Sequence, residues 1–390
     1  MFFQTDCDRS RRRRAVTAVL VLVMMGTLLS LAALTVDVGM LYSARADLQR
    51  AADAGALAGA SAFTSDHMLK VRLGEDVSAS LAGMSSTSLA RIAALSSLNP
   101  SVGLSATVVT ATDVTSGWID LASSTSSIVP NPPGNNYNAL KVMASRDMDG
   151  SNAVVPYFFA SIFGKSSGEV TAEAVAAFDD RVESYDLTEG YLLPFTIHED
   201  VYEDALNNGD DDYGYDGPTD TITEGSDGVR EIDLFPGDLA PGNFGLLNIG
   251  TPNQGEPALA EQIENGVTPE DMEAETGSAD LTFYNGNSSP MTYNITGDPG
   301  LKSSLESNIA TRIGDVIAFL LHDQVTEQGS NATYQITGIR FGRVMDVELN
   351  GPPSGKGLWV QPAIYNGSGV KLSGTAASTG GMVGRIVLVR

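Results

Sequence analysis

The chain has 390 residues, 42% of them hydrophobic, with 41 glycines and 17 prolines, which suits two or three folded domains and excludes a disordered chain. The net charge is −25, and because the first fourteen residues hold five arginines against two aspartates, a local charge of +3, the remainder carries −28. A surface that acidic repels phosphate backbones, which makes nucleic acid a poor candidate partner.

The first predicted element is a membrane-spanning helix. Residues 1–14 form a basic segment, and residues 15–36, from Ala15 to Val36, contain no charged residue. About 22 residues at about 1.5 Å each cross a hydrocarbon core of about 30 Å. A cleaved signal peptide has a shorter apolar core of about 7–15 residues, so we expect a retained anchor, with a cleaved signal as the alternative. The arginines favour a cytoplasmic N-terminus, which places the rest of the chain outside the inner membrane.

The only cysteine, Cys7, precedes the apolar run, so no intrachain disulfide can form. Folding of the chain therefore does not require oxidation.

Residues 37–63 predict a stalk that continues the same helix, because the segment is rich in Ala, Leu and Arg and no proline occurs before Pro100. One face carries residues at heptad or four-residue spacing: Leu41, Leu48, Ala51, Gly55 and Gly59. Small residues at this spacing allow close helix packing. The face could contact a second helix, in self-association, or the chain's own domain, and spacing does not decide between them.

The stretch VDVGMLYSARADLQRAADAGALAGA follows a basic start and one apolar helix. It resembles the N-terminal segment of the TadE/TadG-like family of Flp (tight adherence) pilus-assembly proteins. The matching positions are Asp37, Gly39, Tyr42, Leu48, Gln49, Ala52, Asp53, Ala54, Leu57 and Ala58. The resemblance implies a retained anchor and no catalytic role for these residues. The Gly and Glu positions of the Flp pilin processing site are missing, so cleavage by prepilin peptidase is not expected.

Residues 64–180 predict an α+β region. Its ALKV strand, its PYFFASIFG segment and the later VTAEAVAAF strand resemble the periplasmic part of longer TadG-like proteins. Five of the seven residues from Tyr157 to Phe163 are large and apolar, which predicts a helix buried in the core.

Residues 181–390 predict an acidic β-rich domain, because Gly, Asp, Pro and Asn turns separate short apolar runs. Thr268, Pro269 and Asp271 predict a helix start, and a second short helix is expected from 301 to 313. The alternation of Met345, Val347 and Leu349 indicates a strand with one buried face. The fold class is therefore α+β: a long N-terminal transmembrane and stalk helix, then a mostly antiparallel β extracytoplasmic region with a few short helices.

Two acidic motifs are candidate metal sites. Asp210, Asp212 and Asp216 in GDDDYGYDG are spaced like calcium ligands, although no Glu stands at the twelfth position of an EF-hand. A solvated acidic turn is the alternative. Residues 76–80, DVSAS, have the spacing of a metal-dependent adhesion site, with a Ser-rich polar segment as the alternative.

The sequence lacks the common catalytic motifs. His67, His198 and His322 are the only histidines and form no zinc motif, and nucleophile elbows and Walker loops are absent. We therefore expect a non-enzymatic, membrane-anchored envelope protein without a cofactor, calcium excepted. Its expected role is Flp/Tad-type pilus assembly or secretion, with partners in that apparatus. The alternative is a surface adhesion or calcium-binding module on the same anchor.

Overall fold

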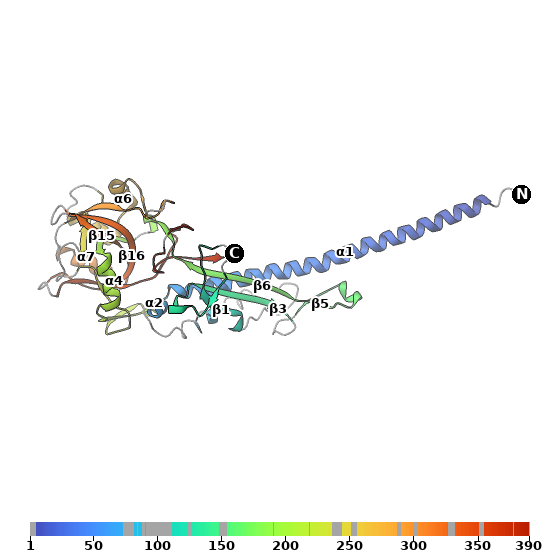
Figure 1. Ribbon diagram of the computed structural model, residues 1–390, viewed down its shortest axis with the longest axis horizontal. Helices are drawn as coiled ribbons and strands as arrows, with labels where there is room; N and C mark the ends of the chain where they lie inside the picture. The colour runs from blue at the N-terminus through green and yellow to red at the C-terminus, as the bar shows by residue number, and fades with distance from the viewer. Residues whose placement is uncertain are drawn as a thin grey trace.

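The computed structural model describes residues 5–72, 82–83, 85–87, 90, 111–123, 127–147, 154–189, 191–217, 219–235, 244–250, 256–286, 290–298, 303–326, 332–350, 355–376 and 378–389. A long helix projects from an elongated body with two lobes (Figure 1). The proximal lobe is the six-stranded sheet with the second half of the helix. The distal lobe contains the seven-stranded sheet and lies farthest from the N-terminus.

The long helix is α1 (Thr5–Ala60), which a short turn η1 (Ser61–Thr64) joins to α2 (Asp66–Arg72). It has one stretch apolar and long enough to cross a membrane, and none of that stretch is buried against the rest of the protein. This fits single-pass membrane anchoring. Burial begins at Asp37, which is 4% exposed, and continues along one face to Ala60.

The proximal sheet has the order β18-β20-β6-β3-β1-β2. The bounds are β1 (Val114–Trp118), β2 (Val129–Pro130), β3 (Ala139–Arg146), β6 (Val170–Asp179), β18 (Tyr365–Asn366) and β20 (Val383–Val389). Strand β6 pairs with β3 on one side, from Ala139↔Ala177 to Arg146↔Val170, and with the C-terminal strand β20 on the other. The chain therefore returns to its first sheet at its end, and residues beyond 181 contribute to both lobes.

The distal sheet has the order β11-β17-β16-β14-β12-β8-β15. The bounds are β8 (Leu192–His198), β11 (Ile232–Asp233), β12 (Phe244–Leu247), β14 (Tyr293–Asp298), β15 (Val316–Thr326), β16 (Thr333–Glu348) and β17 (Gly357–Pro362). Because β15 also pairs with β16, five strands close into a ring, and the two faces of these strands pack into two separate hydrophobic clusters. Pairing in this ring is antiparallel except between β15 and β8.

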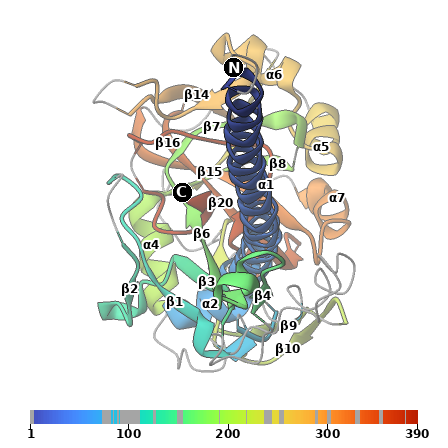
Figure 2. The ribbon, with the colours of Figure 1, turned by 90° about the vertical axis from the view of Figure 1, so that its right-hand side faces the viewer.

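Smaller elements surround the two sheets. The strands are β4 (Val155–Pro156), β5 (Ser167–Gly168), β7 (Val182–Asp186), β9 (Tyr213–Asp216), β10 (Thr221–Glu224), β13 (Asp280–Thr282) and β19 (Val370–Leu372). The helices are α4 (Glu199–Asn208), α5 (Glu256–Asn265), α6 (Pro269–Thr276) and α7 (Glu306–Ala310). The 3-10 turns are η3 (Ala111–Asp113), η4 (Pro133–Asn135), η5 (Ala160–Phe163), η6 (Leu187–Glu189) and η7 (Ser303–Leu305). Seen along α1, the helices α4 to α7 lie around the periphery of the body (Figure 2).

The structure confirms the predicted fold class and several local predictions. Helix α6 begins with a full capping box between Thr268 and Asp271 and with Pro269 in its first turn. Strand β16 buries Met345 and Val347, as the alternation predicts. Of the helix predicted from 301 to 313, the structure describes residues 303–313, and within them η7 and α7 are helical and end at Ala310.

The prediction of a core helix at Tyr157–Phe163 is wrong. The segment is the tip of the β4–β5 hairpin and contains only the turn η5. Phe158, Ile162 and Phe163 are 71%, 77% and 81% exposed. A dense run of large apolar residues usually lies in a hydrophobic core. Here the run lies outside the protein's own core, and an exposed apolar cluster of this kind marks an interaction surface.

Candidate functional site

The carboxylate of Asp37 joins the anchor helix to the β4–β5 hairpin. Its Oδ1 accepts hydrogen bonds from the backbone N–H of Phe158 at 2.7 Å and of Phe159 at 3.1 Å. Its Oδ2 accepts from the N–H of Ala160 at 2.6 Å and of Phe159 at 3.2 Å. Three successive amides of the hairpin thus surround one carboxylate, which fixes the hairpin where the apolar run ends.

The local backbone explains why these amides are available. They precede and open the turn η5, so they have no partners within it. Gly164, at φ 82°, ends the turn, and the N–H of Lys165 returns to the carbonyl of Ala160 at 3.1 Å. Burial alone would raise the pKa of Asp37, but the three amides outweigh it and hold the pKa below its usual range. The carboxylate is therefore held in its charged form.

A second polar contact lies farther along α1. The side-chain amide of Gln49 donates to the carbonyl oxygen of Glu173 in β6 at 3.0 Å and to Asp53 at 2.8 Å. Asp53 orients Gln49, and Gln49 holds the backbone of β6. These two residues of the family motif fasten the sheet to the helix.

Between Asp37 and Ala60, the small-residue face of α1 is buried against the chain's own sheet. Its fully or nearly fully buried members are Ala44, Leu48, Ala51, Ala52, Gly55, Ala56, Gly59 and Ala60, and Leu41 is partly buried. Opposite them, β6 presents Ala172, Ala174 and Ala176, and β3 presents Leu140 and Val142. Small residues on both surfaces allow helix and sheet to approach closely. Of the two partners left open by the spacing, the structure places the chain's own domain on this face.

Gly39 and Tyr42, also predicted from the family motif, lie outside this contact. Gly39 is exposed with open space beside its Cα, and Tyr42 is 71% exposed. Tyr42 lines a groove of about 400 Å³ between α1 and the start of β6. The groove is lined by Val38, Leu41, Tyr42, Arg45, Glu169, Val170 and Thr171.

The candidate calcium residues lie in the distal lobe, on the stretch that leads into and through β9. Asp210, Asp212 and Asp216 are exposed, and Asp216 accepts a hydrogen bond from the Thr219 hydroxyl at 2.6 Å. In the part of the chain that the structure describes, no three His, Cys, Asp or Glu side chains are arranged to hold a metal ion. The DVSAS motif at 76–80 lies outside the described residues.

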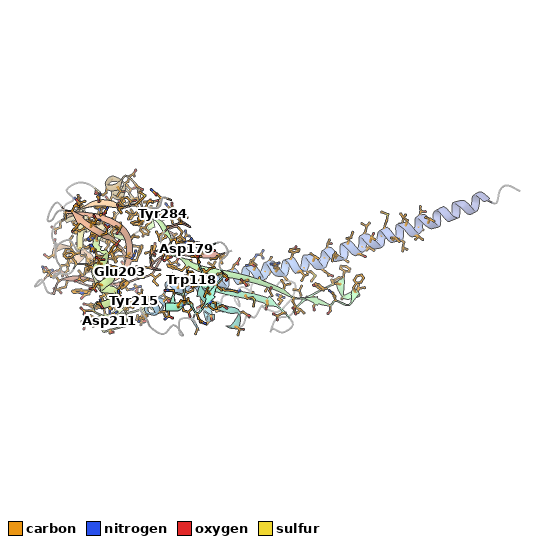
Figure 3. The ribbon with its side chains drawn as sticks, viewed as in Figure 1. Trp118, Asp179, Glu203, Asp211, Tyr215 and Tyr284 are labelled. Atoms are coloured by element: carbon orange, nitrogen blue, oxygen red, sulfur yellow. The ribbon has the colours of Figure 1, made fainter. Side chains whose placement is uncertain are left out.

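The neighbouring Asp211, which the sequence pattern did not single out, is the structural carboxylate of this region. It accepts from the Ser226 hydroxyl at 2.6 Å and from the amides of Asp227 and Gly228 at 2.9 Å each. Figure 3 places Asp211 near Tyr215 in the distal lobe, far from the N-terminal half of α1. The alternating spacing singled out Asp210, Asp212 and Asp216, which are exposed to solvent. Asp211, between the first two, makes the hydrogen bonds that hold the loop.

A buried polar cluster in the distal lobe was also missed. The Gln361 side-chain amide donates to Glu231 at 2.9 Å and to the carbonyl oxygens of Tyr213 and Val229. Burial raises the pKa of Glu231 above its usual range, although hydrogen bonds from Asp212 and Gln361 oppose this. These contacts attach the β9–β10 hairpin to β17. No sequence motif marks them, since the partners are far apart in the chain.

The two histidines of the distal lobe, His198 and His322, pack against each other. His322 is fully buried, with its Nδ1 2.9 Å from the Thr196 hydroxyl, and its ring meets that of His198 edge-on at 5.4 Å. His198 ends β8, and its side chain caps α4.

Comparison with known families bears on the helical part of this site. Residues 15–62 match the model of the Flp pilus-assembly TadE/G-like family. The match confirms the resemblance drawn from the sequence over that segment, and it includes Asp37, Gln49 and the small-residue face. No curated protein and no solved structure gives a significant match to the chain. The match indicates a role in Tad pilus assembly and covers only a small part of the chain.

Proposed function

We propose that the protein is a non-enzymatic, single-pass component of a Tad/Flp-type pilus-assembly or secretion apparatus in the bacterial inner membrane. Its N-terminus lies in the cytoplasm and its two lobes lie outside. The observation that carries this proposal is the junction at Asp37 and Gln49. Asp37 and Gln49 lie in the segment that matches the assembly family, and both contact the extracytoplasmic body.

The junction at Asp37 and Gln49 supports a mechanical role, in which it holds the two lobes rigidly on the anchor helix; we call this junction the mount. Helix α1 is both the anchor and part of the proximal core, so a displacement of the anchor is passed directly to the body. The small-residue face is occupied by β6 and β3, and lateral packing through Gly55 and Gly59 is therefore not part of the proposal. Contacts with other assembly components are assigned to the acidic surface of the two lobes, which carry most of the −28 charge.

Crosslinking in live cells tests this role. Tagged protein is crosslinked, extracted in detergent, and analysed by mass spectrometry for Flp pilin, the secretion ATPase and platform components. We expect the wild type to recover them. The double variant Asp37→Asn with Gln49→Ala, which weakens the mount, should recover less, while Arg50→Ala on the exposed side of the same helix should match the wild type.

Two results would contradict the proposal. Recovery of the protein alone, or with surface polysaccharide and unrelated envelope proteins, would favour the adhesion module. Full recovery of assembly components by the double variant, at wild-type expression, would show that the junction is not needed for the role. Replacing Gly55 or Gly59 with leucine would not separate loss of the assembly role from loss of folding, because both glycines are buried and a leucine would disturb the proximal core itself.

A further inference from the structure

We propose that the tip of the β4–β5 hairpin is a second membrane contact. In this arrangement Phe158, Ile162 and Phe163 insert into the lipid interface beside the anchor helix. The occupant of this apolar surface is the bilayer from which α1 emerges.

Exposure is the first observation. Large apolar side chains that are more than half exposed are confined, among the described residues, to the run from Val16 to Leu34, to this hairpin tip, and to Tyr42 and Tyr191. The three residues of the tip are more than 70% exposed, as high as the most exposed members of the membrane-spanning run. An apolar cluster of this kind on an otherwise acidic body marks an interaction surface.

Position is the second observation. Asp37 is the first charged residue after the apolar run, so it stands where the helix leaves the hydrocarbon. The amides of Phe158 and Ala160 are bonded to that same carboxylate. Of the body, the hairpin reaches farthest toward the N-terminal end of α1 (Figure 1). The exposed tip therefore lies at the level of the membrane surface.

Charge is the third observation. From Val154 to Gly168 the only charged residue is Lys165, which is exposed in the same tip, whereas the chain outside the first fourteen residues carries −28. An acidic body is repelled by anionic headgroups, but this tip is not. Aromatic side chains with a nearby lysine are the composition that favours the membrane interface.

The tip is also held rigidly before it meets lipid. The β4–β5 pairing, the hydrogen bond from Tyr157 N–H to the Ser166 carbonyl at 2.9 Å, and the Asp37 contacts fix both of its ends. Phe158 and Phe159 pack edge-on, with ring centroids 5.0 Å apart. Little conformational freedom is lost when such a loop inserts, and two points of contact with the bilayer fix the tilt of the body.

Depth-dependent quenching tests the contact with the full chain in phosphatidylcholine vesicles. In a Cys7→Ser background, which removes the only cysteine, an NBD probe is attached to Ile162→Cys or Phe163→Cys. Leu28→Cys in the apolar run is the membrane control. Arg50→Cys and Glu203→Cys, on the exposed side of α1 and on α4, are the aqueous controls.

We expect lipids brominated on their acyl chains to quench the probes at 162 and 163 about twofold or more beyond those at 50 and 203. Aqueous iodide should quench the hairpin probes less than the two aqueous controls. Hairpin probes that behave like those at 50 and 203 would overturn the proposal and assign the apolar tip to a protein partner. Because the vesicles contain no assembly components, the result is independent of the pilus-assembly role.

Discussion

The carboxylate of Asp37 satisfies two requirements at one point of the chain. A charged side chain next to the apolar run has to remain close to polar groups, and the first amides of η5 need acceptors. Bonding the carboxylate to three amides meets both. The acidic residue in the family pattern is thus explained by the backbone that it holds.

Asp37→Asn tests this explanation. Asparagine has the same shape but only one acceptor oxygen, and its NH₂ group would face an N–H donor of the hairpin. We expect amide hydrogen exchange of the segment 156–166 to become about tenfold faster or more, measured by mass spectrometry on the full-length protein. Asp53→Asn, whose side chain contacts Gln49 and not the hairpin, is the control. Unchanged exchange in Asp37→Asn would contradict the role of the carboxylate.

At Asp211 the same kind of contact predicts a pH dependence. Burial alone would raise the pKa of Asp211, but hydrogen bonds from Ser226, Asp227 and Gly228, with Lys70 nearby, hold the pKa below its usual range. A depressed pKa adds stability that is complete above the ordinary value of about 3.9 and is lost as the pH falls through the folded-state value.

The difference in free energy of unfolding between wild type and Asp211→Asn should therefore be constant from about pH 7 to about pH 5 and shrink below about pH 4. Chemical denaturation at a series of pH values measures it. A difference of the same size at pH 7 and pH 3 would show that the charge of Asp211 does not contribute.

At the scale of elements, the central contact is between α1 and the sheet formed by β6 and β3. Ala56 is fully buried in it, whereas Ala46 is exposed on the other side of the helix. Ala56→Leu should lower the free energy of unfolding by about 1–3 kcal/mol, because the added side chain has no space against the sheet. Ala46→Leu should change it by less than about 0.5 kcal/mol.

Denaturant unfolding of both variants in detergent measures the change in free energy of unfolding. The oligomeric state of each variant is determined in the same detergent. If the face instead served a second copy of the helix, Ala56→Leu would change the oligomeric state and leave the stability of the monomer intact. That result would contradict the packing seen in the structure.

Local patterns in the sequence predicted much of this element structure. The capping box at Thr268, the alternation in β16 and the continuous helix through Asp37 are each specified by neighbouring residues. The family motif singled out Asp37 and Gln49, but the contacts that those side chains make with the hairpin and with β6 could not be predicted.

Non-local pairing could not be predicted from such patterns. The apolar run from Ile386 to Val389 favours a strand, but it does not say that β20 pairs with β6, about two hundred residues earlier. The partner of Gln49 is likewise a backbone carbonyl in β6. At Phe158 and Phe163 the dense apolar pattern is the same for a buried helix and for an exposed hairpin tip, so the pattern alone does not distinguish the two.

At the scale of the whole molecule, several elements join the two lobes. Helix α2 places Met68 and Val71 in the proximal core and Leu69 in the distal one. The Lys70 ammonium donates to the Asp227 backbone carbonyl. Strand β20 places Val383 against the distal core while Ile386 packs on the proximal core. An interface built from shared elements favours unfolding of both lobes as one unit.

The two tryptophans of the chain test this cooperativity, because Trp118 lies in the proximal sheet (Figure 3) and Trp359 in strand β17 of the distal sheet. Trp359→Phe leaves a fluorescent reporter of the proximal lobe, and Trp118→Phe leaves one of the distal lobe. We expect their denaturation curves to coincide, with equal midpoints and slopes. Separate midpoints would mean that the lobes unfold independently, and α2 and β20 would then be tethers between two mobile parts. Coincident curves are what a rigid mount requires, since a force on the anchor can reach the distal lobe only through a body that holds its shape.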